Sequence, residues 1–475
     1  MSPSVGVRGI ETEYGVAAPP LTADEVAREM FAPVVAWGRS TNVFTPAGAR
    51  LYLDVGSHPE YATAESASLA DLLAQDLAGD RIMWALADHA AGRLGREVAV
   101  FKNNSDSAGH SFGSHENYQV ARSGSVSLPQ ALIPFLVTRQ LVAGAGLIQV
   151  NPSGARYVLS ARADHISESL SAATTRARPM INTRDEPHAD GNRFRRLHVI
   201  VGDSNMSQAA TAFRFGATSL VIRAVGEGHS FKAWALADPV RAIREVSHGW
   251  RQARPVRLAD GRSVRPVEIQ RAYLEAANEV ASCGEDTAVI GLWRRCVDGW
   301  ERLDFAGLET ELDWLAKLRL IERYRERSGL PLADPKVIRL TLAYHQLGPV
   351  GLRGKLEAAD LLWSGVDQLD AAKAVLQPPP TTRAYLRGRF VRAARAAGST
   401  YSADWTRLKL GEYPPVVLLD PLEPGDQTAL DLINQVAALS GDGQLVRTDG
   451  AASANGPAVL SDFDRILEQA ANQPA

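Results

Sequence analysis

A short stretch of alternating residues gives the clearest secondary-structure signal in this sequence. Between residues 50 and 55 apolar and polar side chains alternate with a period of two, which predicts a strand with two unlike faces. The apolar face consists of Leu51, Leu53 and Val55, and the polar face of Arg50, Tyr52 and Asp54. Residues 56–59 then predict a turn, because Gly permits unusual backbone angles and Pro ends strand pairing. A second extended run follows, with Glu60, Thr63 and Glu65.

A pair of carboxylates near the N-terminus follows the same periodicity. Residues 9–16 predict a strand bracketed by glycines, in which Glu11 and Glu13 project from one face. Like charges this close repel each other, and an apolar core cannot accommodate them. A solvated strand face and a ligand-binding face both explain the pair.

Two further predicted strands carry histidines. In residues 114–120, His115 and Asn117 share one face, while Glu116 and Tyr118 share the other. In residues 195–201, His198 lies opposite the apolar side chains, so it need not be buried among them. Each histidine is either a structural residue or a member of a site.

Helical periodicity and chain breaks organise the rest. Helices are predicted from Thr22, as a cap, towards Trp37, from Ser68 to about Leu94, through most of residues 266–327, and from Arg383 to about Ala397. The basic residues from Lys317 to Arg327 alternate with acids, which is typical of a solvated helix face. We predict a large domain over residues 1–398 and a small C-terminal domain over residues 399–475, with a mobile segment near residues 449–457.

Composition restricts the class of protein without identifying an activity. The 475 residues are 45% hydrophobic and 22% charged, with a net charge of −3, so no global field favours nucleic acid or an anionic membrane. No apolar run is long enough for a membrane span, and no secretory signal is evident. Two cysteines argue against a disulfide framework. These features fit a cytoplasmic enzyme and equally a cytoplasmic scaffold.

The polar residue types suit phosphoryl chemistry. Mg²⁺ prefers oxygen ligands and usually bridges carboxylates to nucleotide phosphates, so the four glutamates are candidate ligands: Glu11, Glu13, Glu60 and Glu65. Arg50 could bind a phosphate through its planar fork, and Asp54 could act as a general base. Gly-rich segments such as residues 144–146 lack the pattern of a phosphate-binding loop. If ATP binds, metal and carboxylates must hold it.

Four segments resemble the Pup ligase and Pup deamidase family, which is related to glutamine synthetase. They are residues 9–15 (GIETEYG), 50–65 (RLYLDVGSHPEYATAE), 181–190 (INTRDEPHAD) and 195–207 (RRLHVIVGDSNMS), and the likeness extends from about residue 7 to residue 410. The resemblance implies an α+β fold, in which a curved antiparallel, glutamine-synthetase-like sheet of the carboxylate–amine ligase type packs with helices. It also implies the small C-terminal domain.

The resemblance further implies an activity and its residues. A ligase of this kind uses ATP and Mg²⁺ to phosphorylate the side chain of the C-terminal Glu of Pup, a small protein modifier. It then joins that Glu to substrate lysines, which marks the substrates for proteasomal degradation. By motif position, Glu11, Tyr52 and Glu60 would sit at Mg²⁺, Arg50, Thr63 and Trp405 would contact ATP, and Asp54 would deprotonate the lysine. Further candidates are Glu13, Glu65, His115, Asn117 and His198.

Other activities stay open within and outside this family. A depupylase typically carries a long insertion soon after the base-bearing turn, whereas here Glu65 runs directly into the predicted helix at Ser68, which favours ligation. An inactive Pup-binding adapter and a small-molecule glutamate–amine ligase are the remaining alternatives. Because Pup is expected to be acidic, we look for a basic groove among Arg193, Arg195, Arg196 and the helix at residues 317–327.

Overall fold

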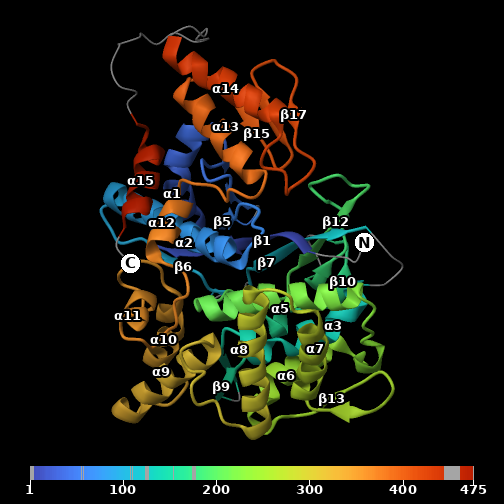
Figure 1. Ribbon diagram of the computed structural model, residues 1–475. Coiled ribbons are helices and arrows are strands. Elements are labelled where there is room, and N and C mark those ends of the chain that lie inside the picture. Colours follow the sequence, from blue (N-terminus) through green and yellow to red (C-terminus); the bar gives the residue numbers. More distant parts are fainter. Residues whose placement is uncertain are drawn as a thin grey trace.

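The architecture was analysed in a computed structural model of the chain. It describes residues 5–54, 56, 58–106, 109, 111–122, 128–152, 154–173, 178–442 and 460–473. Figure 1 shows a central sheet with a large group of helices on one side and a smaller unit of helices and short strands on the other.

The central sheet has eight strands in the order β10-β11-β12-β7-β1-β5-β4-β3, and only the β10–β11 pair is parallel. Its strands are β1 (Val5–Glu13), β3 (Asn42–Phe44), β4 (Arg50–Leu53), β5 (Pro59–Ala62), β7 (Ser114–Ala121), β10 (Glu168–Ser171), β11 (Pro179–Asn182) and β12 (Phe194–Val199). The strand predicted over residues 9–16 is divided at Tyr14. Its second part, β2 (Gly15–Ala17), leaves the sheet and pairs with β6 (Ala99–Phe101).

The strand registers place the polar positions on one face. Glu13 pairs with Glu60, Tyr52 with Glu60, and Glu11 with His115. Because directly opposed residues of antiparallel strands share a face, these side chains gather above the centre of the sheet. Asn117 and His198, which are also paired, extend the same face.

The opposite face of the sheet packs on the largest hydrophobic core. Ile10, Tyr118, Leu197 and Val199 from the strands contact buried residues of the surrounding helices. These helices are α3 (Leu128–Thr138), α4 (Gln140–Ala143), α5 (Gln208–Gly226), α6 (Pro239–Gly249), α7 (Pro266–Val280), α8 (Gly284–Arg302) and α9 (Asp313–Ser328). The same region holds two hairpins, β8 (Leu147–Asn151) with β9 (Gly154–Val158) and β13 (Val256–Arg257) with β14 (Ser263–Val264), and three short 3₁₀ segments at Ala163–His165, Lys232–Trp234 and Trp250–Gln252.

A second core surrounds the long helix α2 (Leu69–Leu94), which begins after Ser68 as predicted. The helix predicted after Thr22 is α1 (Ala23–Gly38), and its capping box is formed by Thr22 and Glu25. This core also includes residues of α10 (Pro335–His345), α11 (Arg353–Ala358), α12 (Gln368–Ala374) and α15 (Asp462–Asn472).

A third, smaller core lies on the other side of the sheet (Figure 1). Leu386 and Phe390 of α13 (Ala384–Ala396) pack there on three short strands and on α14 (Gln427–Asp442). The strands are β15 (Tyr401–Ala403), β16 (Arg407–Leu410) and β17 (Val416–Val417). The division of the chain at residue 398 remains a prediction, and the predicted mobile segment near residues 449–457 lies outside the described residues.

The solvated face predicted for the basic residues of α9 is wrong for Lys317, whereas Arg319, Arg323 and Arg327 are exposed. Lys317 is buried, and its ammonium donates to Gly146 O and contacts His345 Nε2, both at 2.7 Å, because α9 packs that face on the main core. Figure 1 shows α9 at the lower left and β12 at the right, near the middle of the molecule, and the basic groove expected from both segments stays a prediction. No helix among the described residues is long and apolar enough to cross a membrane.

Candidate active site

A cavity of about 280 Å³ lies between the polar face of the sheet and the smaller unit. Arg50 and Thr63 line it from the sheet, His188 from the loop after β11, and Trp405 and Pro421 from the smaller unit. The predicted nucleotide contacts Arg50, Thr63 and Trp405 therefore come together on the walls of one cavity. Their role as nucleotide contacts is a prediction that the geometry does not test.

The local packing fixes the orientation of these three side chains. Arg50 donates through Nε to Asn42 Oδ1 at 2.7 Å and stacks on the Tyr52 ring, with Cζ 4.2 Å from the ring centroid. Thr63 Oγ1 accepts the Ile10 amide hydrogen at 3.0 Å, which leaves the hydroxyl hydrogen available for a ligand. Trp405 packs edge-on against Phe44, and the Arg387 guanidinium lies 5.0 Å from its ring centroid.

A carboxylate cluster lies beside this cavity, where β1, β5 and β4 meet. Glu11 accepts the phenolic hydrogen of Tyr52. Burial, together with the negative charges of Glu11 and Glu13, raises the pKa of Glu60 well above its ordinary value. Burial and the negative charges of Glu11 and Glu60 raise the pKa of Tyr52, so the phenol stays neutral and acts as a donor. A cluster of this charge is balanced best by a bound cation.

Two histidines and an arginine complete the cluster. His115 lies between the two β1 carboxylates, with Nδ1 3.6 Å from Glu11 Oε2 and Nε2 3.7 Å from Glu13 Oε1. His198 Nε2 lies 3.9 Å from Glu11 Oε2, so one atom each from Glu11, His115 and His198 could contact a single metal ion. Burial tends to raise the pKa of Glu11. The hydrogen bond and charge of His115 and the charge of Arg196 outweigh this effect and hold the pKa of Glu11 well below its ordinary value.

Burial and the neighbouring Arg196 charge also lower the pKa of His198 well below its ordinary value. A neutral imidazole has a free nitrogen lone pair for a ligand. Asn117 accepts from Arg196 Nε at 2.7 Å, so the amide holds this arginine against the cluster. Asn117 lines the cavity as well.

Asp54 and Glu65, at the two ends of the opening motif, have different environments. Asp54 follows β4 and is exposed, and its charge contributes to the raised pKa of Glu60, so it lies near the carboxylate cluster. Glu65 lies beyond the end of β5, and both its oxygens are occupied by Arg383 and Arg387 of the smaller unit. Glu65 therefore lines the same cavity as Glu11, but its oxygens are held by the two arginines of the smaller unit.

The sequence pattern missed several residues that shape this site. Arg196 was assigned to a basic groove. It is two residues from His198 on β12, and this spacing places both side chains on the same face of the sheet. His188 and Arg383 are joined by a hydrogen bond of 2.6 Å from Arg383 Nη2 to the His188 carbonyl. The two residues are 195 positions apart in the chain, so no local sequence pattern predicts this contact.

Comparison with known proteins agrees with this fold. The sequence model described as "Pup-ligase protein" matches residues 6–409. A Pup–protein ligase of Saccharomonospora viridis is 48% identical, covering 90% of this chain and 99% of that protein, and one of Mycobacterium tuberculosis is 47% identical, covering 90% and 98%.

Solved structures of Pup ligases share the architecture. The ligase PafA in complex with Pup superimposes with a TM-score of 0.86 and 38% identity, covering 92% of this chain and 93% of that one. PafA in complex with ADP gives a TM-score of 0.80 and 40% identity, covering 90% and 96%.

The fold and site define an enzyme of the ATP-dependent ligase class, and the predicted α+β, glutamine-synthetase-like fold class is confirmed. Within that class, the chain belongs to the Pup-ligase family.

Proposed function

We propose that this protein joins the side-chain carboxylate of the C-terminal Glu of Pup to lysines of other proteins, using ATP and Mg²⁺. One observation carries the proposal. In a chain of the Pup-ligase family, a carboxylate cluster lies directly beside a cavity lined by Arg50, Thr63 and Trp405. The cavity can hold a nucleotide with its phosphates towards the cluster.

The residues present fit a divalent cation. The raised pKa of Glu60, caused by burial and two neighbouring carboxylates, indicates a surplus of negative charge that a cation would relieve. Glu11 and Glu60 would hold the ion, and Tyr52 would orient Glu11 through its hydrogen bond. Bound Mg²⁺ neutralises phosphate charge and so favours phosphoryl transfer.

The reaction has two balanced steps. The γ-phosphoryl group of ATP moves to an oxygen of the Glu side chain, which gives an acyl phosphate and ADP. The lysine nitrogen then attacks the carbonyl carbon, phosphate leaves, and an isopeptide bond forms. Asp54 accepts the amine proton, for which its exposed position beside the cluster is suitable.

The nucleotide base would occupy the end of the cavity beside Trp405. The Trp405 ring is held by Phe44 and Arg387, so an aromatic base can pack against it at little cost in side-chain entropy. Arg50, whose guanidinium is already oriented by Asn42, would bind a phosphate oxygen. We place the reaction in the cytoplasm, as a step that directs substrates to the proteasome.

One experiment separates ligation from the alternatives. The protein is mixed with Pup ending in Glu, a lysine-bearing acceptor, Mg²⁺ and ATP, and the products are analysed by gel and mass spectrometry. A conjugate with the mass of both proteins minus one water supports the proposal. Release of Pup from a premade conjugate, without formation of new conjugate, would assign the hydrolase activity instead. Binding of Pup with neither reaction would indicate an adapter.

A further inference from the structure

A second cavity, lined by arginines, lies on the outer face of α6, among the helices on the side of the sheet away from the smaller unit (Figure 1). Its volume is about 320 Å³. The helix buries its apolar side chains in the main core, so its charged positions, spaced three or four residues apart, face outwards. Four arginines line the cavity, which we call the α6 pocket: Arg156 of β9, Arg241 and Arg244 of α6, and Arg254 after the helix.

The acidic groups that face the α6 pocket are already engaged. Asp238 caps α6 by accepting from the Arg241 amide at 2.9 Å, and Glu245 accepts from Arg241 Nε at 2.7 Å. His248, which also lines the pocket, pairs with Asp164 at 3.0 Å. The other three arginines of the pocket form no ion pair with a carboxylate of the described residues, so the pocket keeps a surplus of positive charge.

These three guanidinium groups have neutral partners or none. Arg156 donates through Nε to Gln149 Oε1 at 2.8 Å, and Arg244 donates through Nη2 to the Ile166 carbonyl at 2.8 Å. Arg244 Nε is buried, and it has no hydrogen-bond partner among the described residues. The Arg254 guanidinium forms no hydrogen bond or ion pair with another described residue. Because buried donors normally have an acceptor, this set of groups is suited to an anionic ligand.

The arrangement of the pocket favours a small anion with adjacent phosphate groups. Its guanidinium groups come from a strand, a helix and the segment after that helix, so they can contact one ligand from different directions. A planar guanidinium binds phosphate oxygens in pairs, and a diphosphate has enough oxygens for three such groups. The volume lies in the range of pockets for small ligands, which favours such an anion over an extended acidic peptide.

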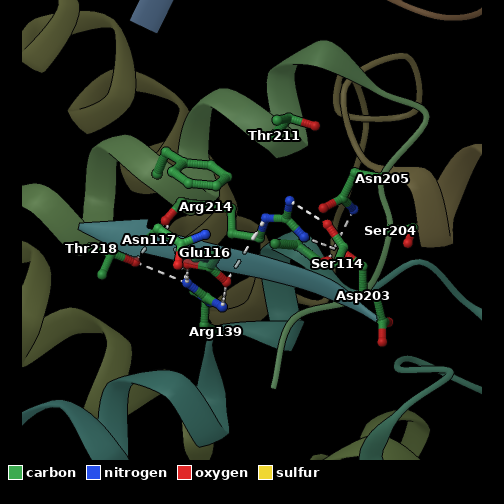
Figure 2. A network of polar contacts seen from close by, with 12 residues as sticks. Ser114, Glu116, Asn117, Arg139, Asp203, Ser204, Asn205, Thr211, Arg214 and Thr218 are labelled. Atoms are coloured by element: carbon green, nitrogen blue, oxygen red, sulfur yellow. Dashed lines mark hydrogen bonds and ion pairs between the residues drawn. The ribbon is translucent and has the colours of Figure 1, made fainter. Parts of the chain in front are cut away.

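A buried polar network separates the α6 pocket from the active site. Ser247 Oγ of α6 accepts from the Ser160 amide at 3.0 Å, and Ser160 Oγ donates to the Asp203 carboxylate at 2.9 Å. Figure 2 shows how Arg214 continues this network from Asp203 to Ser114 on β7. The carboxylate cluster lies beyond the network, on the polar face of the sheet. A ligand in the α6 pocket would therefore bind independently of one in the active site.

We propose that the α6 pocket binds a small anion with adjacent phosphate groups. Such a ligand supplies an acceptor to Arg244 Nε and negative charge to the guanidinium groups of Arg156 and Arg254. A free inorganic anion and the phosphates of a nucleotide share this chemistry. None of the three arginines belongs to the proposed machinery of ligation, so the proposal holds whether or not the protein forms conjugates.

Calorimetry with inorganic diphosphate, in buffer without Mg²⁺, tests the site. Wild-type protein should bind diphosphate, and Arg244→Met should bind it roughly tenfold to a hundredfold more weakly, because a charged hydrogen bond is lost. Arg254→Met should also weaken binding, without a change in thermal midpoint, because this exposed side chain has no partner among the described residues. That variant keeps the test valid if Arg244→Met does not fold.

Arg251→Met is the matched control. Arg251 is exposed, pairs with Glu322 and does not line the pocket, although it precedes Arg254 by only three residues. The same loss of charge should therefore leave the affinity for diphosphate unchanged. Arg244→Lys, which keeps the charge but not the planar fork, should retain part of the affinity.

Arg50→Met separates the α6 pocket from the active site, because Arg50 lines only the other of these two cavities. This variant should keep the diphosphate site that Arg244→Met loses. The affinity that Arg244→Met removes is then compared for two ligands: a larger loss for diphosphate indicates a free inorganic anion, and a larger loss for ADP indicates a nucleotide.

Three results would overturn the proposal. The first is wild-type protein that does not bind diphosphate, including the case in which it binds only a Glu-rich peptide. The second is an affinity for diphosphate that is the same in Arg244→Met and Arg254→Met as in wild type. The third is an equal loss of affinity in Arg251→Met, which would show attraction by net charge alone.

Discussion

Glu65→Gln tests whether a buried ion pair holds the smaller unit against the sheet. The Glu65 carboxylate accepts from Arg383 Nε at 2.9 Å and from Arg387 Nη1 at 3.1 Å, and it also accepts from Arg387 Nη2. Glutamine keeps the shape but removes the charge, so two buried guanidinium groups lose their counter-ion. Breaking a buried pair in this way costs about 3 to 5 kcal/mol.

The pKa of Glu65 gives a second measure of the same interaction. Burial opposes ionisation, but Arg387 and Arg383 lower the pKa from 4.5 to about 2. One pKa unit corresponds to about 1.36 kcal/mol, so the folded state gains roughly 3 kcal/mol from the ionised carboxylate. Since the folded pKa is depressed, this contribution is complete above about pH 4.5 and is lost as the pH falls towards about 2.

Hydrogen exchange of the α13 amides, followed by mass spectrometry, provides the assay. A loss of roughly 3 kcal/mol should reduce their protection about a hundredfold at neutral pH. The difference between wild type and variant should shrink as the pH falls below about 4.5. Glu245→Gln is the matched control, because Glu245 forms an exposed pair with Arg241 that is worth under about 0.5 kcal/mol. A loss of less than tenfold, or a difference that does not change with pH, would refute the reasoning.

The remaining predictions concern the reaction. Asp54→Asn should reduce the conjugation rate by roughly 10²- to 10⁴-fold while ATP affinity stays the same, as gel assays and calorimetry would measure; unchanged conjugation removes Asp54 from its role. Glu11→Ala should weaken ATP binding at least about tenfold in the presence of Mg²⁺ and less without it, and equal affinities would argue against a metal contact. Removal of Mg²⁺ by EDTA should abolish conjugation, and readdition should restore it. Trp405→Ala should weaken ADP binding roughly tenfold, whereas Trp363→Ala on the surface should not.

The sequence predicted the strands of the site well because their periodicity is local. The alternation from Arg50 to Leu53 became β4, and His115 and Asn117 lie on one face of β7 as expected. The chain between β4 and β5 turns back, so the register sets Tyr52 opposite Glu60. The family resemblance then indicated which of the polar faces carries the chemistry.

Burial of charged residues was the part that local pattern could not predict. Lys317 lies in a segment that reads as a solvated helix face and Arg387 in a predicted helix, yet each has buried partners on distant segments. In the sequence, Glu65 belongs to the motif at residues 50–65. In the structure, its carboxylate pairs with Arg387 of α13. The partners of these charges are decided by tertiary packing, which periodicity does not describe.

The cavity draws its walls from both ends of the chain, from Val7 on β1 to Pro421 after β17. During synthesis, more than four hundred residues must therefore follow β1 before the cavity has all its walls. Contacts of such long sequence separation form late in folding. A chain that stops before α13 would leave Glu65 without its arginines and the cavity without Trp405. Chains that stop before α13 should thus be inactive.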